Sequence, residues 1–266
     1  LLSNNTLLVT TEPSSVKTYE SVYTRQFGHV LTGQENWALK HRNKIRSQPA
    51  LYWFYGFKSG KGDNLSYDYI ANNPPSVKKD EISTVTSTKR HRHTLHRKRY
   101  DFIEKLQCRL PELERFGKGI REITDKAEAL DPYKYHIAIE NHICDHWWTE
   151  KLSDSFLGLC LPLYHGAPNA SEYFPPDSFI SININDFEGS YKIISDAIKN
   201  NEYEKRLPAI KEARELVLKK YNFYATVAQI VEQKNTAKPS AKSEKSIYVK
   251  SRALMRKNPI YATYTL

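Results

Sequence analysis

Apolar residues in this chain form short runs that alternate with stretches of helical spacing. A short, continuous apolar or β-branched run is typical of a buried strand. Such runs predict strands at residues 7–10, 29–32, 51–55, 82–86, 135–139, 161–164 and 179–184. Apolar positions three or four apart predict helices at residues 95–106, 149–159, 191–199 and 202–231, the last interrupted at Pro208, and residues 35–41 are helix-compatible. This alternation predicts an α/β fold whose parallel sheet is covered on both faces.

Two changes in composition divide the chain. Residues 55–79 are rich in Gly, Asn, Pro and Ser and predict a connection between two units. From residue 234 the chain becomes rich in Lys, Ser, Ala and Pro, which is typical of a flexible linker. We therefore expect domains over residues 1–78 and 79–233, followed by a linker and tail over 234–266. The sequence starts with Leu1 rather than Met, which is compatible with a first domain that lacks an N-terminal strand.

The positive charge is concentrated in two places. The chain has 40 Lys and Arg against 30 Asp and Glu, a net charge of +10. Residues 89–99 carry +6 and residues 234–266 carry +7, so the remainder is mildly acidic at −3. A nucleic-acid-binding protein needs a broad basic face, so we expect no nucleic-acid partner. Residues 247–257 alternate basic with apolar side chains, which fits either a solvated terminus or a peripheral contact with anionic lipid.

Several signals are missing from the sequence. The longest strongly apolar run, residues 156–164, is far shorter than the ~20 residues that span a bilayer. No signal-peptide pattern opens the chain. The three cysteines, Cys108, Cys144 and Cys160, lack CxxC spacing and predict reduced thiols. We expect a cytoplasmic protein, peripheral to the inner face of the membrane if the tail binds lipid.

One segment combines groups that suit an anionic ligand. Glu140 and Asn141 follow a predicted strand, and open α/β sheets bind ligands at the carboxyl ends of strands. Thr149 is a good helix N-cap, and the N–H groups after it form an anion site. Lys151 opposes the dipole of that helix, a conflict that an anionic ligand would resolve. The alternative is a lysine that extends to solvent.

Four spaced motifs follow one another over about fifty residues. They are the E-N pair at 140–141, Trp147 two residues before T-E-K at 149–151, the strand and loop from Pro162 through Pro168 (P-x-Y-x-G-x-P), and F-P-x-x-S-F-I at 174–180. This series resembles the donor-binding motif of the α-1,3/4-fucosyltransferases, glycosyltransferase family 10. Arg99 and the Glu12-Pro13-Ser14 element also resemble family positions. The resemblance extends loosely from residue 7 and firmly from residue 82 to residue 199.

The resemblance implies a GT-B architecture, in which two Rossmann-like domains face each other across a cleft. Residues 1–78 would handle the acceptor and residues 79–233 would bind GDP-fucose. The implied reaction inverts the anomeric centre, with Glu12 as the general base. The implied donor-binding residues are Arg99, Glu140, Asn141, Trp147, Thr149, Glu150 and Lys151.

The resemblance also implies how the leaving group is neutralised. Arg99 and Lys151 would neutralise the departing pyrophosphate, and Glu150 would bind the ribose hydroxyls. No D-x-D motif occurs, so no metal and no cofactor is expected beyond the donor. His142, Asp145 and His146 lie close in sequence but lack a ligand pattern typical of a metal site.

The partners that follow are GDP-fucose and an oligosaccharide or lipid-linked glycan acceptor. Two alternatives stay open: a relative that uses another nucleotide sugar, and a non-catalytic RNA- or carbohydrate-binding protein. The sequence contains no motif that identifies the acceptor or the linkage.

Overall fold

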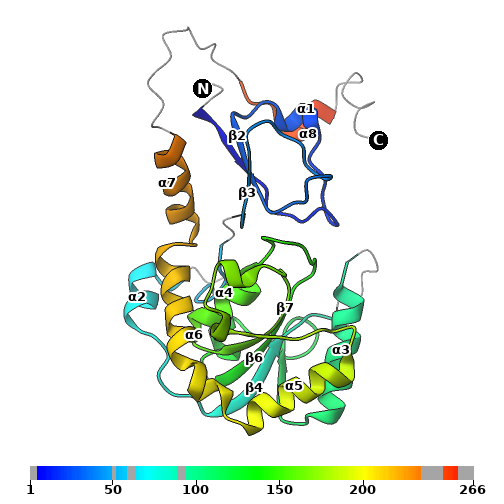
Figure 1. Cartoon of the computed structure of the whole chain (residues 1–266), viewed down its shortest axis with the longest axis vertical. Coiled ribbons are helices and arrows are strands. Elements are labelled where there is room, and N and C mark those ends of the chain that lie inside the picture. Colours follow the sequence, from blue (N-terminus) through cyan, green and yellow to red (C-terminus); the bar gives the residue numbers. More distant parts are fainter. Residues whose placement is uncertain (1–4, 50–51, 59–63, 89–93, 235–247, 257–266) are drawn as a thin grey trace.

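The chain forms two units, each built on a parallel sheet (Figure 1). The computed structural model describes residues 5–49, 52–58, 64–88, 94–234 and 248–256. The first unit contains a three-stranded sheet in the order β1-β2-β3, formed by Leu7–Val9, His29–Thr32 and Lys44–Arg46. Leu8 pairs with Val30, and Leu31 pairs with Ile45.

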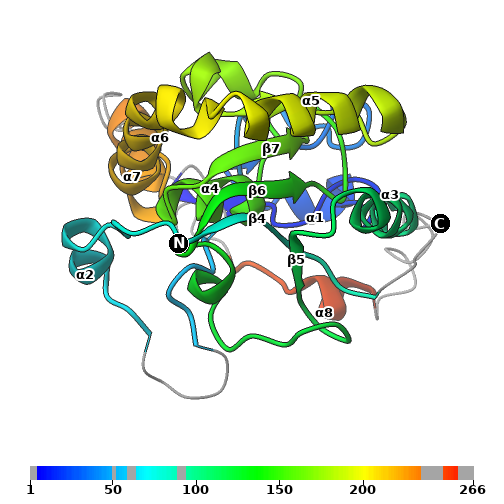
Figure 2. The ribbon, with the colours of Figure 1, turned by 90° about the horizontal axis from the view of Figure 1, so that it is seen from below.

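The second unit contains a five-stranded parallel sheet in the order β5-β4-β6-β7-β8. Its strands are β4 (Asp80–Val85), β5 (Leu113–Phe116), β6 (Tyr133–Ile139), β7 (Leu161–His165) and β8 (Ile180–Ser181). Its helices are α2 (Tyr67–Asn72), α3 (His96–Arg109), α4 (Glu150–Leu157), α5 (Phe187–Lys199) and α6 (Glu202–Lys219), with 3-10 turns η2 (Lys126–Ala129), η3 (Ala170–Glu172) and η4 (Pro176–Ser178). Figure 2 shows α5 and α6 along the β7 side of this sheet.

A continuous core holds the second unit together. Apolar side chains from α3, α4 and α6 pack against those of the central strands. Among them are Ile103, Leu106, Phe156, Ile137, Leu161, Leu163, Ile210 and Val217, each at most 1% exposed. This burial is what the near-continuous apolar runs of β6 and β7 predict for a sheet covered on both faces.

The first unit takes part of its packing from the end of the chain. Ile230 of α7 (Phe223–Lys234) packs against Leu31 in the centre of the small sheet. The segment after the linker contains the helix α8 (Arg252–Arg256), which lies near the helix α1 (Ser21–Thr24). Arg252 forms an ion pair at 2.6 Å with Glu20, the residue before α1. The last described residues therefore pack on the first unit, beside α1 (Figure 1).

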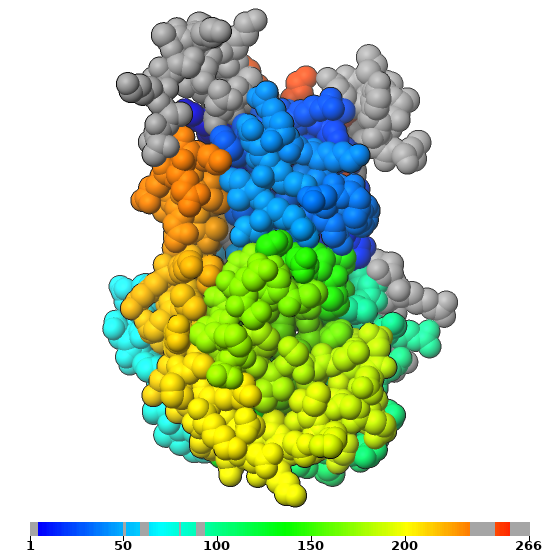
Figure 3. Space-filling view, viewed as in Figure 1, coloured from blue at the N-terminus to red at the C-terminus, as the bar shows by residue number. Residues whose placement is uncertain are grey.

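The two units meet at the carboxyl ends of their strands. Gly33, directly after β2, lies against Trp147 from the loop after β6, and a Cβ on Gly33 would be 2.9 Å from the indole ring. Figure 3 shows the first unit seated on the loops of the second. The predicted α/β class and the GT-B-like arrangement of two facing parallel-sheet units are confirmed.

Some predicted elements are wrong in detail. Residues 52–55 form no strand, and residues 35–41 form turns instead of a helix. Pro208 lies inside α6 without interrupting it. A proline removes one backbone hydrogen bond, and here the packing of Ile210 and Val217 outweighs that loss. The short strands β3 and β5 and the helix α2 were not predicted, because their apolar residues are too few to show a period.

The domain boundary at residue 78 stays a prediction: the first sheet ends at Arg46 and the second begins at Asp80, but Ile70 of α2, between them, packs in the core of the second unit. Residues 89–93 and 235–247, which hold much of the predicted basic run and the linker, lie outside the described residues. In the described part of the chain, none of the helices combines the length and the apolar character needed to span a bilayer.

Candidate functional site

A hollow of about 230 Å³ lies at the carboxyl ends of β4 and β6, and we call it the strand-end hollow. Its wall contains Ser87 after β4, Gly117 after β5 and Asn141 after β6. A Cβ on Gly117 would lie 2.1 Å from the carbonyl oxygen of Thr86, so only glycine allows this close approach. Four cationic side chains line the hollow: Arg99, Lys118, Lys126 and Lys151.

Arg99 is the most deeply buried of these cations, with 6% of the residue exposed. Its Nη1 donates to Asn141 Oδ1 at 2.7 Å and to the carbonyl oxygen of Ile139 at 3.3 Å. Burial lowers the pKa of Arg99, while the charges of Glu140 and Glu150 oppose that shift. Among the described residues no carboxylate forms an ion pair with it. A buried guanidinium held only by neutral acceptors favours an anion beside it.

Lys151 has partners of opposite charge within the protein. Its Nζ lies 2.8 Å from Glu150 Oε1 and 3.5 Å from Glu140 Oε2. Burial opposes the charged lysine, but these two carboxylates raise the pKa of Lys151 above its usual value. The conflict between this lysine and the helix dipole is thus relieved by Glu140 and Glu150, and the side chain does not simply extend to solvent.

Glu150 connects two of the lysines. Lys126 Nζ lies 3.8 Å from Glu150 Oε1, and the same oxygen forms an ion pair with Lys151. Burial by itself raises the pKa of Glu150, yet the charges of Lys151 and Lys126 lower it to about 2. Glu150 is therefore ionised at neutral pH and lines the strand-end hollow as a hydrogen-bond acceptor.

Glu140 and Thr149 form a buried pair behind the hollow. Glu140 is fully buried and accepts from the Thr149 backbone N–H at 2.8 Å and from Thr149 Oγ1 at 2.8 Å. Thr149 is the N-cap of α4, and its hydroxyl accepts from the Lys151 backbone N–H. The carboxylate of Glu140 therefore binds the N-cap residue of α4, next to the helix N-terminus where the sequence predicted an anion site. The cationic side chains are left as the groups that can hold an external anion.

Trp147 and Glu12 lie outside the lining of the strand-end hollow. Trp147 is buried at the contact between the units, edge-on to His142 with ring centres 6.3 Å apart. Glu12 is exposed in the loop after β1, and its backbone carbonyl accepts from Gln34 Nε2 at 2.8 Å. Three residues further on, Ser15 lines an inter-unit hollow of about 500 Å³, together with Thr94, Leu95, Arg97, Lys98, Asn141, His142 and Ile143.

Three further polar residues belong to the site and were given no role from sequence. Lys126 Nζ lies 2.8 Å from Asp154 Oδ2, and Asp154 also accepts from the Phe54 backbone N–H at 3.0 Å. His136 lines the hollow, bonds Ser83 Oγ through Nδ1 at 2.8 Å, and has its pKa lowered to about 3 by burial. A histidine inside an apolar strand, such as His136, carries no sequence signal of such a role.

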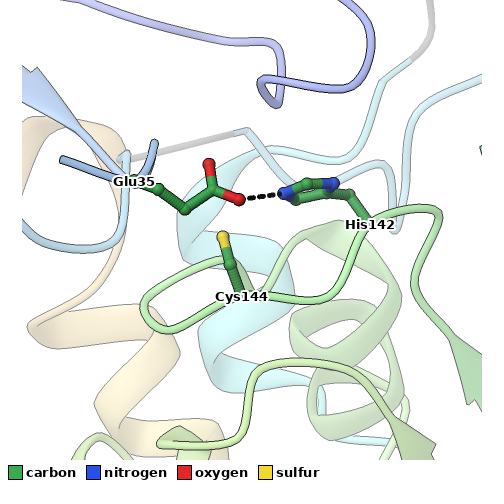
Figure 4. A group of neighbouring side chains, drawn as sticks. All are labelled: Glu35, His142 and Cys144. Atoms are coloured by element: carbon green, nitrogen blue, oxygen red, sulfur yellow. Dashed lines mark hydrogen bonds and ion pairs between the residues drawn. The ribbon is translucent and has the colours of Figure 1, made fainter. Parts of the chain in front are cut away.

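The histidines considered for a metal separate in the structure. His146 Nδ1 bonds the Tyr173 hydroxyl at 2.6 Å. His142 Nε2 instead lies 3.1 Å from Glu35 Oε1 in the first unit (Figure 4). Within the described residues, the group of three potential ligands is Glu35, His142 and Cys144.

Comparison with known proteins shows a family similarity within the second unit. Residues 75–200 match the family described as glycosyltransferase family 10 (fucosyltransferase) C-term. The α-(1,3)-fucosyltransferase FucT of Helicobacter pylori is 33% identical over 66 residues, which are 25% of this chain and 13% of that protein. The α-(1,3)-fucosyltransferase C of Drosophila melanogaster is 38% identical over 58 residues, which are 21% and 14%. The chain thus matches about one seventh of the length of each relative.

Solved structures also align with this chain. A crystal structure of α1,3-fucosyltransferase with GDP-fucose is 20% identical, with a TM-score of 0.48, over 68% of this chain and 61% of that one. A crystal structure of α1,3-fucosyltransferase with GDP is 17% identical, with a TM-score of 0.47, over 74% and 72%. The GtfA/B complex is 9% identical, with a TM-score of 0.48, over 80% and 46%. From the sequence comparisons, the chain is similar to glycosyltransferase family 10 over residues 75–200, and the predicted resemblance is confirmed.

Proposed function

We propose that this protein is a glycosyltransferase that transfers fucose from GDP-fucose to a glycan hydroxyl with inversion of the anomeric centre. The observation that carries the proposal is the buried Arg99, which has no carboxylate partner among the described residues and lines a hollow at the ends of β4 and β6. The match of residues 75–200 to a fucosyltransferase family supports the choice of donor.

The cations of the strand-end hollow suit a departing nucleoside diphosphate. Negative charge develops on the pyrophosphate as its bond to the sugar breaks, and fixed cations stabilise that charge. Arg99 supplies a guanidinium that forms no ion pair with a carboxylate of the described residues, and Lys151 and Lys126 add two ammonium groups. Glu150 is ionised and can accept from the two hydroxyls of a ribose. These side chains take the place of a metal ion, so we expect no cofactor.

The general base comes from the first unit in this proposal. Glu12 follows β1 at the carboxyl edge of the first sheet, which is the edge turned toward the second unit. As the acceptor oxygen attacks the anomeric carbon, its proton passes to the Glu12 carboxylate and GDP leaves from the opposite side. The inter-unit hollow that Ser15 lines is the candidate place for the acceptor glycan.

Calorimetry with GDP tests the donor site. We expect the wild type to bind GDP and Arg99→Met to bind roughly 100-fold more weakly, because a buried charge contact is lost. Arg109→Met is the matched control, since Arg109 lies on the same helix but is exposed and pairs with Glu188. Glu12→Gln should keep GDP affinity and lose transfer. An absence of GDP binding by the wild type would overturn the proposal.

The other candidate functions predict different results. A relative with another donor sugar would hydrolyse GDP-mannose or a UDP-sugar faster than GDP-fucose. An RNA-binding protein would show an affinity that falls steeply with salt. A carbohydrate-binding protein without catalysis would bind glycans but leave GDP-fucose intact. None of these is favoured by a particular observation in the structure.

Peripheral membrane contact of the tail stays a prediction. Tyr248 is 94% exposed and Leu254 is 56% exposed, so apolar area is available on this segment. Arg252, in contrast, is engaged by Glu20 of the first unit. Sedimentation of the protein with anionic vesicles, compared with neutral ones, would test the contact.

A further inference from the structure

Three potential metal ligands converge where the two units meet (Figure 4). Their donor atoms, Glu35 Oε1 or Oε2, a ring nitrogen of His142 and Cys144 Sγ, all lie within 4.8 Å of one another. We call Glu35, His142 and Cys144 the inter-unit trio. Glu35 Oε1 bonds His142 Nε2 at 3.1 Å, while Glu35 Oε2 is buried and has no hydrogen-bond partner among the described residues.

Local backbone contacts hold two members of the trio, Glu35 and Cys144. Glu35 begins a turn after β2, where its carbonyl oxygen accepts from the Ala38 and Leu39 N–H groups. Cys144 lies in the loop after β6, where its carbonyl accepts from the Trp147 N–H and its thiol lies 3.5 Å from the Gly33 carbonyl oxygen. Glu35 and Cys144 are therefore held by backbone hydrogen bonds in their own loops, and the Cys144 thiol also contacts the first unit at Gly33.

We propose that the inter-unit trio binds a zinc ion. A thiolate, an imidazole and a carboxylate together suit zinc better than the hard cations magnesium and calcium. Bond lengths of about 2.0 Å to nitrogen and 2.3 Å to sulfur place the ligand atoms of a tetrahedral site roughly 3.3–3.6 Å apart. The Glu35–His142 separation is already close to this value, so mainly the Cys144 side chain has to move inward.

Zinc binding releases one proton, from the Cys144 thiol. Zinc binds the thiolate of Cys144, so the thiol proton passes to solvent, and His142 binds as neutral imidazole through Nε2. A water molecule completes the tetrahedron, because the chain provides three ligands. The Cys144 thiolate and the Glu35 carboxylate each carry one negative charge, so together they offset the two positive charges of the zinc ion.

Such an ion would join the two units. Glu35 belongs to the first unit, whereas His142 and Cys144 belong to the second. Zinc that binds all three ligands stabilises only the arrangement in which the units are in contact. The role is structural, and it does not depend on the proposed transfer reaction.

Metal titration of the full chain tests the site. We expect metal-free protein to bind one zinc per chain in competition with a chromophoric chelator, and to show a thiolate–metal absorption band with cobalt. Cys144→Ala leaves the Glu35–His142 hydrogen bond in place, so it separates a metal site from a simple polar contact. This variant and His142→Ala should lose at least about 100-fold in zinc affinity. Cys108→Ala is the matched control, because Cys108 is an exposed thiol elsewhere, and it should bind as the wild type does.

Thermal unfolding tests the link between the units. Zinc should raise the unfolding midpoint of the wild type and of Cys108→Ala but leave that of Cys144→Ala unchanged, while circular dichroism shows that the variants remain folded. Failure to bind one zinc per chain, a cobalt spectrum without the thiolate band, or equal affinity of Cys144→Ala and wild type would overturn the site. Stoichiometric binding with no change in the midpoint would overturn the structural role.

Discussion

The two units reach a similar parallel-sheet design in different ways. The second unit spans five strands with one continuous core drawn from neighbouring helices and strands. The first unit has three short strands and only small apolar clusters, one of which pairs Leu31 with Ile230. Arg252, more than 200 residues beyond the strands of the first unit, also packs on it. The second unit is therefore locally cohesive, whereas the first depends on the far end of the chain.

This difference bears on the candidate site. Arg99, Lys126, Lys151 and Glu150 all belong to the cohesive unit and are held by its core. Glu12 and Glu35 belong to the unit that depends on distant contacts. We therefore expect donor binding to be the more robust property, and any step that needs both units to be the more fragile one.

The largest expected effect comes from the core of the second unit. Phe156 is fully buried and its ring centre lies 4.8 Å from that of Phe174, so Phe156→Ala should cost about 3–5 kcal/mol in the free energy of unfolding. Denaturant titration measures this loss, and hydrogen exchange should rise throughout β4–β7. An increase confined to the first unit would contradict the contrast between the units.

Acid should also destabilise the second unit through His136. The folded state lowers the pKa of His136 to about 3, so the unfolded state binds a proton that the folded state excludes below pH 6.5. The contribution of His136 to stability therefore falls as the pH drops from 6.5, by roughly 3 kcal/mol at pH 4. Glu140 and Asp154, whose pKa values burial raises, act in the opposite sense.

The variant His136→Gln isolates that contribution. Its unfolding free energy should change less between pH 6.5 and pH 4 than that of the wild type, whatever its stability at neutral pH. Denaturant unfolding at a series of pH values measures the two slopes. Equal slopes would show that His136 is not the group responsible.

A smaller effect is expected where α7 supports the first unit. Ile230→Ala should cost about 2 kcal/mol, at the low end for a buried isoleucine because the residue is 9% exposed. Hydrogen exchange should increase in β1–β3 and stay unchanged in β4–β7, and GDP affinity should be kept. Val231→Ala, at an exposed position on the same helix, is the control and should have little effect. Equal loss of protection in both sheets would mean that the units unfold together.

Local patterns predicted most of the second unit. The apolar runs of β4, β6 and β7 and the helical spacing of α3 and α4 were visible because buried strands and amphipathic helices impose their own periods. The first unit was harder to predict. Its strand β3, Lys44-Ile45-Arg46, has one apolar residue and no period, so only pairing with β2 makes it a strand.

The candidate site also has features that the sequence predicted and features that it did not. The motifs around Asn141 and Lys151 predicted an anion site at the end of β6, because the carboxyl end of a parallel strand and a helix N-terminus adjoin in any open α/β sheet. They could not predict that Glu140 turns inward to accept hydrogen bonds from Thr149, the N-cap of α4, because this contact depends on the backbone of the loop between them.

The sequence by itself determined the α/β class, the order of most elements and the resemblance of the second unit to glycosyltransferase family 10, since these depend on local periodicity and motif spacing. Only the tertiary structure decided that Arg99 lacks a carboxylate partner among the described residues, that Lys126 and Lys151 both pair with Glu150, and that His142 meets Glu35 of the first unit. Such contacts join elements far apart in the chain, and their geometry depends on how the two sheets pack together.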